Sequence, residues 1–183
     1  MATTPNTLLI PLLLLLLNPT TATSTPPKAA VPPVVPVVEG IVYCQKCLTY
    51  GTWSLTAAEP IASATVGVIC KDHRRRVSYY KACKTDDNGY FWAELKGFKM
   101  HNYFLDHPLH SCSVRLVSSP LKTCNVLTNI NYGLNGAPLR YEDKKIMEKN
   151  YEAVVYAAGP LAFRPAVCVP HGGDSDGDGD GED

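Results

Sequence analysis

Cysteine is the residue type in this sequence whose spacing points most directly to chemistry. Seven cysteines occur, and two of them form the motif Cys44-Gln45-Lys46-Cys47. This spacing serves a thioredoxin-like redox pair when the first cysteine begins a helix, or half of a zinc site when a second C-x-x-C follows. The residues before Cys44 alternate as in a β-strand, Gly51 follows, and there is no second C-x-x-C. The pattern therefore favours disulfides over both alternatives.

A cationic cluster follows in the run Lys71-Asp72-His73-Arg74-Arg75-Arg76, which packs four Lys or Arg side chains into six residues. Arginine can pair its planar guanidinium group with a carboxylate through two hydrogen bonds. Two interpretations remain open: an ordinary solvated turn, and a binding site for a polyanion. The candidates for polyanion binding are Lys71, Arg74, Arg75 and Arg76.

Aromatic side chains close to this cluster offer a possible platform for sugar rings. Tyr79, Tyr80, Tyr90 and Trp92 fall on two strands that we expect to be adjacent. Because successive side chains of a strand point to opposite faces, Tyr79 and Tyr80 cannot both face the core. We expect most of these rings to be core residues and the remainder to be candidates for stacking on sugars.

No catalytic constellation is evident. His101, His107 and His110 fall within ten residues, but without a metal-ligand spacing, and Pro108 indicates an irregular loop. There is no G-x-S-x-G nucleophile motif and no phosphate-binding glycine loop. We predict no enzymatic activity, no catalytic residue, no cofactor and no metal.

The segments on either side of the cysteine-containing region differ from it in composition. Leu8 to Leu17 is apolar and precedes small residues, and it is only about half as long as a membrane span, so residues 1–24 are predicted to be a signal peptide. Thr25 to Val38 is rich in Pro and Val and is predicted to be an extended spacer. Residues 171–183 are predicted to be a disordered acidic Gly/Asp tail, which leaves residues 39–170 as one β domain.

The zero formal charge of the chain conceals a separation of charge. All 17 Lys and Arg residues lie between Lys28 and Arg164, where the net charge is +6, and the tail carries −6. A secreted protein meets an oxidising environment, which favours disulfides and leaves one of seven cysteines over. The same location argues against nucleic acid as the partner of the basic region, and no segment of the mature chain is apolar enough to span a membrane.

The central region shows a β pattern. Short alternating or β-branched runs predict seven strands, and the Asn-Gly step in Asp86–Gly89 predicts a hairpin between the third and fourth. Residues 141–150 are predicted to be an exposed loop or one short turn. The strands are expected at Ile41–Cys47, Ala64–Cys70, Arg76–Tyr80, Tyr90–Leu95, Cys112–Val117, Tyr151–Tyr156 and Leu161–Cys168. The predicted fold class is all-β, a disulfide-stapled, seven-stranded antiparallel barrel or sandwich.

Several stretches resemble one plant secreted family. Glu39–Cys47 reads E-G-I-V-Y-C-Q-K-C, and Lys84–Phe91, Cys112–Leu116 and Tyr156–Pro165 match as well. Together they resemble the family of the olive-pollen major allergen and extensins, and most closely its Pro-rich, arabinogalactan-protein-like branch. If the source is a plant, Pro26, Pro32 and Pro36 of the spacer can become hydroxyproline glycosylation points, and a bare stiff spacer is the alternative.

The resemblance implies a disulfide pattern as well as a fold. It pairs Cys44 with Cys124, Cys47 with Cys168, and Cys70 with Cys112. Cys83 departs from the family pattern and is either a free thiol or a link to another chain. Gln45 and Leu48 also depart from the acidic and basic residues usual at their positions.

The resemblance also implies a location and a general role. We expect a secreted, extracellular protein of the plant cell wall that contributes to wall organisation during growth. Its expected partners are wall polysaccharides, namely pectin, galactan or arabinogalactan, and wall glycoproteins. The alternative is a secreted protein ligand or a protease-inhibitor-like module that acts through protein–protein contact.

Overall fold

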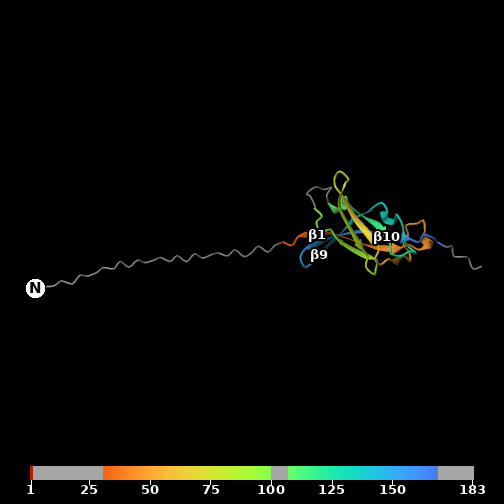
Figure 1. Ribbon diagram of the computed structural model, residues 1–183, viewed down its shortest axis with the longest axis horizontal. Coiled ribbons are helices and arrows are strands. Elements are labelled where there is room, and N and C mark those ends of the chain that lie inside the picture. The colour runs from red at the N-terminus through yellow and green to blue at the C-terminus, as the bar shows by residue number, and fades with distance from the viewer. Residues whose placement is uncertain (2–30, 100–106, 169–183) are drawn as a thin grey trace, which may run out of the picture. The chain divides into compact units, whose positions relative to one another are not determined.

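The computed structural model describes residues 31–99 and 107–168, together with Met1. Within them the regular secondary structure is almost entirely β-strand (Figure 1). The one α-helix described, α1, is the single turn Pro108–Ser111, and two 3-10 turns are η1 (Cys47–Thr49) and η3 (Ile130–Tyr132). The strands are β1 (Val34–Cys44), β2 (Glu59–Pro60), β3 (Thr65–Lys71), β4 (Val77–Lys84), β5 (Tyr90–Glu94), β6 (Cys112–Ser118), β7 (Val126–Leu127), β8 (Ala137–Pro138), β9 (Arg140–Met147) and β10 (Glu152–Arg164).

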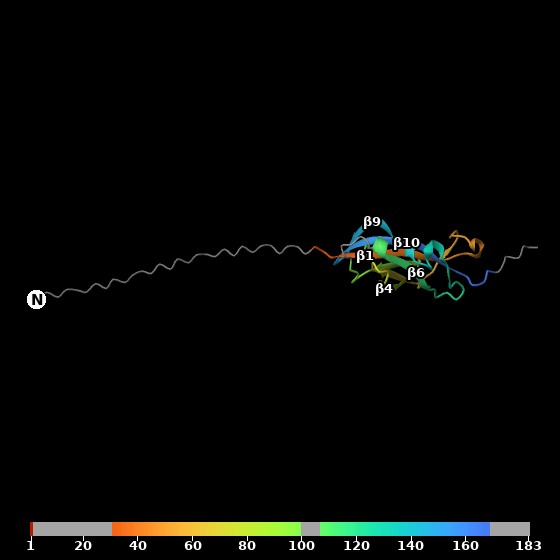
Figure 2. The ribbon, with the colours of Figure 1, turned by 90° about the horizontal axis from the view of Figure 1, so that it is seen from above.

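The strands form two sheets that pack face to face. In sheet A, β1 and β10 are central; β2 and β5 pair with the outer side of β1, while β7 and β9 pair with the outer side of β10. Sheet B has the order β4-β3-β6-β8. Figure 2 shows β1, β9 and β10 in one layer and β4 and β6 in the other. The predicted all-β sandwich with three disulfides is confirmed.

The core lies between the two layers and is built from alternate residues of the central strands. On β3, Val66, Val68 and Cys70 are buried, and the residues between them face outwards. β-Branched side chains pack well on such a pleated surface. From sheet A the core receives Val38, Val42, Phe91, Ala93, Leu161 and Phe163, and from sheet B also Val114 and Leu116.

One pair of strands departs from the antiparallel prediction. β1 and β10 run parallel, with Val37 opposite Val155 and Gly40 opposite Ala158, whereas the other strand pairs are antiparallel. The two strands predicted over residues 151–156 and 161–168 are largely one continuous strand, β10. Hydrophobic alternation indicates which face of a strand is buried but not the direction of its partner, so the sequence left this open.

The first strand begins earlier than the predicted position. The spacer was predicted to extend to Val38, but β1 starts at Val34, and both Val37 and Val38 have no exposed surface. The strand also ends at Cys44 rather than Cys47. Pro36 explains why the strand was predicted to start too late, because proline has no N–H to donate and is rare in a central strand. In the structure the carbonyl of Pro36 still accepts from Leu95 N at 2.8 Å.

The Asn-Gly turn is present, but it does not close a hairpin. Asp86 accepts from the backbone N–H groups of Asn88 and Tyr90, and Gly89 has φ of +72°. β4 pairs with β3 and β5 pairs with β1, so the turn carries the chain from sheet B to sheet A. Buried Thr85 fixes this crossing, because its hydroxyl donates to Ile61 O and accepts from Ala64 N.

The segment predicted as an exposed loop over residues 141–150 is mostly a strand. β9 pairs antiparallel with β10, from Glu152 opposite Met147 to Ala157 opposite Arg140. Its side chains are nearly all exposed on both faces. An edge strand that buries neither face carries no hydrophobic alternation, so the pattern used to predict strands was missing.

Several predictions fall outside the described residues. These are the signal peptide, the spacer before residue 31, the acidic tail and His101. Among the residues that the structure does describe, no helix has the length and hydropathy needed to cross a bilayer.

Candidate functional site

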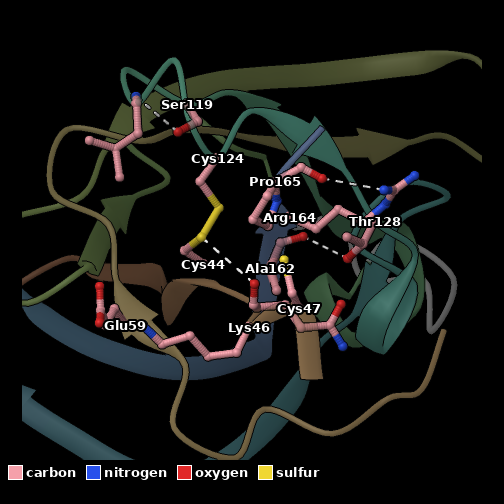
Figure 3. Close-up of a disulfide and its surroundings, with 12 residues drawn as sticks. Cys44, Lys46, Cys47, Glu59, Ser119, Cys124, Thr128, Ala162, Arg164 and Pro165 are labelled. Carbon is pink, nitrogen blue, oxygen red and sulfur yellow. Dashed lines mark hydrogen bonds and ion pairs between the residues drawn. A yellow bond between two sulfur atoms is a disulfide. The ribbon is translucent and has the colours of Figure 1, made fainter. Parts of the chain in front are cut away.

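The six cysteines that pair do so as the resemblance implied. Cys44 is bonded to Cys124, Cys47 to Cys168 and Cys70 to Cys112, across 80, 121 and 42 residues of sequence. Figure 3 shows the Cys44–Cys124 bond beside the ion pair of Lys46 and Glu59. Cross-links over such distances restrict the unfolded chain, and each contributes about 2–4 kcal/mol to stability. The C-x-x-C motif therefore ties the end of β1 to two distant segments.

The redox and zinc alternatives for this motif find no support in the described part of the chain. Cys44 and Cys47 each bond to a different distant cysteine rather than to each other. Residues 31–99 and 107–168 contain no group of three His, Cys, Asp or Glu side chains that could hold a metal ion. Cys83 makes no disulfide, and its half-buried side chain packs against the core. Burial raises the pKa of the Cys83 thiol to about 11, so it carries little thiolate at neutral pH.

The cationic cluster forms the turn between β3 and β4, and one acidic residue organises it. The carboxylate of Asp72 accepts from the backbone N–H groups of Arg74 and Arg76, both at 2.9 Å, and from the guanidinium group of Arg76. These contacts, first of all the backbone N–H of Arg76, hold the pKa of Asp72 below its ordinary value. Arg75 has φ of +61° at the tip of the turn.

The four cationic candidates consequently play two different roles. Arg76 forms an ion pair with Asp72 at 2.8 Å, so its charge stabilises the turn. Lys71, Arg74 and Arg75 are exposed, and no described residue pairs with their side chains. We call these three residues the hairpin cations. They present three positive charges on one rigid turn.

The charge of the hairpin continues onto sheet B and not onto sheet A. The four strands of sheet B contain Lys71, Lys81, Lys84 and Arg115 and no Asp or Glu. The strands of sheet A contain six acidic residues and four basic ones, and most of the acids have partners. The acids of sheet A with partners are Glu39 with Lys144 and Tyr90, Glu59 with Lys46, Glu94 with Lys96 and Tyr151, Glu142 with Arg140, and Glu152 with Lys145.

The predicted aromatic platform is divided between the two sheets. Tyr79 and Tyr80 lie on β4 in sheet B, while Tyr90 and Trp92 lie on β5 in sheet A, because the Asn-Gly turn crosses between the layers. The four rings therefore do not form one surface. Tyr80 is the most open of them, with 55% of its surface exposed.

The other three rings of that set are held by contacts within the domain. Tyr79 packs edge-on against Phe98 and donates to Lys96 O at 3.2 Å. Tyr90 donates to the carboxylate of Glu39, and burial raises its pKa. Trp92 is half-buried and lies opposite Glu39 on β1.

Of the described histidines, His107 has contacts that give it a structural role. The Nδ1 atom of His107 accepts from Leu109 N at 3.4 Å and so caps α1, and its Nε2 lies 3.3 Å from Tyr156 Oη. Burial lowers the pKa of His107. These contacts suit a neutral imidazole that holds a helix end.

Gln45 has a role that sequence analysis did not identify. Its side chain is 2% exposed, and Nε2 donates to the carbonyl oxygens of Thr49, Thr52 and Ser54 at 2.9–3.1 Å. An amide can donate in this way, whereas a carboxylate cannot. The departure from an acidic residue at this position, which the sequence did show, was the available signal. Gln45 thus fixes the loop that follows the C-x-x-C motif.

That loop carries exposed aromatic side chains at the disulfide-bonded end of the sandwich. Trp53 and Tyr132, 57% and 51% exposed, meet edge to face with their ring centroids 5.5 Å apart. The guanidinium group of Arg164 lies over the ring of Tyr50, 4.6 Å from its centroid. Next to them on η1, Leu48 is almost fully exposed. We call Leu48, Tyr50, Trp53 and Tyr132 the aromatic end.

Two proteins similar in sequence to this chain come from plants. Over 136 residues it is 30% identical to non-classical arabinogalactan protein 30 of Arabidopsis thaliana, a match that covers 70% of this chain and 52% of that protein. It is 31% identical over 143 residues to the pistil-specific extensin-like protein of Nicotiana tabacum, covering 74% of this chain and 32% of the relative. This chain thus spans about half of the first relative and a third of the second.

A structure comparison finds the crystal structure of the major plantain pollen allergen Pla l 1. It aligns with a TM-score of 0.49 and 25% sequence identity, covering 75% of this chain and 98% of the allergen. Neither of the two relatives is named as an enzyme. No protein-family model matches the chain.

Proposed function

We propose that this chain is a secreted, non-enzymatic protein of the plant cell wall. The support is its homology to plant arabinogalactan and extensin-like proteins, which also confirms its resemblance to the pollen-allergen and extensin family. Its β domain binds acidic wall polysaccharide. The binding helps to organise the wall matrix during growth.

The observation that carries this proposal is the uneven distribution of charge over the domain. Sheet B and its hairpin expose cations without acidic neighbours in the same strands, and the one acid of the turn, Asp72, is occupied by Arg76. A surface of one sign attracts ligands of the opposite sign and raises their local concentration. The plant cell wall offers such a ligand in de-esterified pectin, a polymer of uronic acids.

The guanidinium groups of Arg74 and Arg75 suit this ligand chemically. Each can donate two parallel hydrogen bonds to a carboxylate, and each is exposed. The turn is held by Asp72, so little ordering is needed when the polymer binds. Because the contacts are ionic and exposed, added salt weakens them.

The test is retention of the full chain, with its disulfides formed, on immobilised polysaccharides at low and high salt. Each exposed ion pair is worth roughly 0.2–1 kcal/mol, so replacing both Arg74 and Arg75 by Ala weakens binding to de-esterified pectin about tenfold at low salt. The matched control is Lys144→Ala with Lys145→Ala, which also removes two positive charges but from sheet A. We expect the control to change retention by less than about twofold, because those lysines pair with Glu39 and Glu152.

Equal losses in the two double variants would show that only net charge matters, and the hairpin site would then be wrong. If the unmodified chain is not retained by pectin, galactan or arabinogalactan, the polysaccharide function itself fails.

A second function, contact with a protein, is favoured by the aromatic end. Trp53 is exposed although its loop is held by Gln45, and Tyr132 is exposed although η3 is tied to β10 by Asn131, whose Nδ2 donates to Pro160 O at 2.7 Å. Rigid exposed aromatic side chains are typical of binding hot spots. This function is supported if the full chain captures wall glycoproteins or proteases, if salt does not weaken the capture, and if Trp53→Ala abolishes it. Capture that Trp53→Ala leaves unchanged contradicts it.

A further inference from the structure

The outer face of sheet B contains one open aromatic ring seated on a glycine. Val66 and Val68 point into the core, so Gly67 between them faces outwards. A Cβ added to Gly67 would lie 3.0 Å from Cε2 and 3.2 Å from Oη of Tyr80. One face of the Tyr80 ring therefore rests on the backbone of Gly67. Because 55% of Tyr80 is exposed, its other face is open to ligands.

An arginine lies on the strand that pairs with the other edge of β3, directly opposite Gly67. Gly67 on β3 pairs with Arg115 on β6, and both neighbours of Arg115, Val114 and Leu116, are buried. Arg115 therefore also points outwards. Its Nε atom donates to Asn135 O at 3.0 Å, which fixes the guanidinium group and leaves its terminal nitrogens available as donors.

The two side chains therefore lie on the outer face of sheet B, on the strands either side of β3, and Gly67 itself is buried beneath the Tyr80 ring. Paired strands lie about 4.8 Å apart, so β4 and β6 on either side of β3 are about 9.6 Å apart at Gly67. Ser113, two residues before Arg115 on the same strand face, adds a hydroxyl group to this surface. An aromatic ring, a fixed guanidinium group and a hydroxyl on one surface offer a stacking face, a carboxylate partner and a hydrogen-bonding group.

From this arrangement we propose that Tyr80, Gly67 and Arg115 form a subsite for one uronic acid unit of an acidic polysaccharide. The C–H face of the sugar ring stacks on Tyr80, and the carboxylate accepts from the terminal nitrogens of Arg115. This inference rests on the proposed function and adds the chemical class of the sugar that it recognises.

Charge selects this ligand over a neutral sugar or a peptide of mixed charge. The strands of sheet B contain cations and no acid, so a carboxylate meets no repulsion on this face. The subsite also continues into the hairpin cations. Lys71 lies four residues from Gly67 along β3, about 13 Å at about 3.3 Å per residue. A single polymer chain can thus contact the subsite and the hairpin together, and the two contacts reinforce each other.

An added Cβ at Gly67 would press on the far end of the Tyr80 ring, 3.0 Å from Cε2, so the ring would have to shift by a few tenths of an ångström. Tyr80→Phe, in contrast, keeps the ring and removes only the hydroxyl, and Arg115→Lys keeps the charge but removes the planar fork.

The experiment measures affinity of the full chain for oligogalacturonate and for dextran sulfate, a polyanion without uronic acid. We expect Tyr80→Ala and Arg115→Lys each to weaken oligogalacturonate binding about fivefold to tenfold and to leave dextran sulfate binding within about twofold. Tyr80→Phe should bind as the unmodified chain does. Trp92→Ala, which removes a half-buried ring from sheet A, is the matched control and should also have no effect. Thermal unfolding of each variant checks that it is folded.

A second probe separates charge from ring recognition. Methyl esterification of the oligogalacturonate removes the carboxylate and keeps the ring, so the residual affinity should depend on Tyr80 and no longer on Arg115.

The outcomes that overturn the subsite differ from those that overturn the proposed function. If Tyr80→Ala and Arg115→Lys weaken both polyanions equally, or neither, sheet B contributes charge alone and the subsite is wrong. In that case binding that still depends on Arg74 and Arg75 preserves the proposed function. If the unmodified chain binds neither polyanion at low salt, the proposed function fails and the subsite fails with it.

Discussion

Sheet A and sheet B use their polar side chains in different ways. In sheet A the carboxylates of Glu39 and Glu94 each meet a lysine and a tyrosine hydroxyl of the same domain. In sheet B and its hairpin, Lys71, Arg74 and Arg75 meet no side-chain partner among the described residues. Groups satisfied within the fold stabilise it, whereas groups left open on a rigid surface are available for a ligand.

The division follows from the topology of the chain. Sheet A contains the two central strands β1 and β10, and sheet B contains the tight turn that collects the arginines. We therefore expect substitutions in sheet A to change stability with little effect on polysaccharide binding. Substitutions on the outer face of sheet B should change binding with little effect on stability.

The largest expected effect is that of Phe91→Ala in sheet A. Phe91 is 1% exposed and packs over Gly40 in the core. Removing its ring costs about 3–5 kcal/mol of unfolding free energy. Urea unfolding with intact disulfides measures this loss. Pectin retention of the folded fraction should remain unchanged. If the variant is fully folded and is nevertheless retained less by pectin, the division of roles between the two sheets is wrong.

A smaller loss is expected from Gln45→Ala. The substitution leaves three carbonyl acceptors of the following loop without the amide donor, at a cost of about 1–3 kcal/mol. Gln45→Glu is the informative companion, because it keeps the shape and replaces a donor by acceptors. We expect it to be the more destabilising of the two above the pKa of the new carboxyl group. Urea unfolding at pH 7 shows which of the two variants is less stable. If Gln45→Ala is less stable than Gln45→Glu, the Gln45 side chain stabilises the fold by filling space and not by donating hydrogen bonds.

The smallest expected effect concerns Glu94 and its dependence on pH. Lys96 and then Tyr151 hold the pKa of Glu94 below its ordinary value of 4.5. The folded state therefore binds this proton less readily than the unfolded state. The stabilisation is present above about pH 4.5 and is lost as pH falls through the lower pKa of the folded state.

Glu94→Gln should abolish this part of the acid sensitivity, a change of less than about 1 kcal/mol for so exposed a pair. The same variant offers a second readout, because the hydrogen bond to Glu94 raises the pKa of Tyr151 to about 12. In the variant the Tyr151 pKa should fall back towards its ordinary value of 10. An NMR titration measures the Tyr151 pKa, with Tyr151→Phe used to assign the Tyr151 signal. If the Tyr151 pKa is the same in Glu94→Gln as in the unmodified chain, the hydrogen bond between Tyr151 and Glu94 is wrong.

Sequence patterns predicted the buried strands best. β3 and β6 alternate clearly, with Val66, Val68 and Val114 buried, and the structure places them within a residue or two of the prediction. Their success has a physical cause, because one face of each strand must be apolar to form the core. The Asn-Gly turn was equally readable, since Gly89 adopts a positive φ.

Patterns failed where pairing, not burial, decides the structure. The direction of β1 relative to β10 leaves no trace in either strand's alternation, and β9 buries neither face. The crossing at Thr85 separates β4 from β5 although their connection reads as a hairpin. The expectation that the strands carrying Tyr79–Tyr80 and Tyr90–Trp92 are adjacent was wrong for the same reason.

The candidate site was predicted in part. The run of cations was visible, but not that Asp72 would occupy Arg76 and leave Arg74 and Arg75 open. Nor does the sequence show that Tyr80, Gly67 and Arg115 lie together, since they belong to three strands and meet only through the register of sheet B.

The sequence by itself determined the β class, the buried face of the main strands and the cationic character of the turn, because these depend on local composition and a period of two residues. Only the tertiary structure decided which strands pair, which charges are satisfied and which rings stay open, because those depend on contacts between residues far apart in the chain.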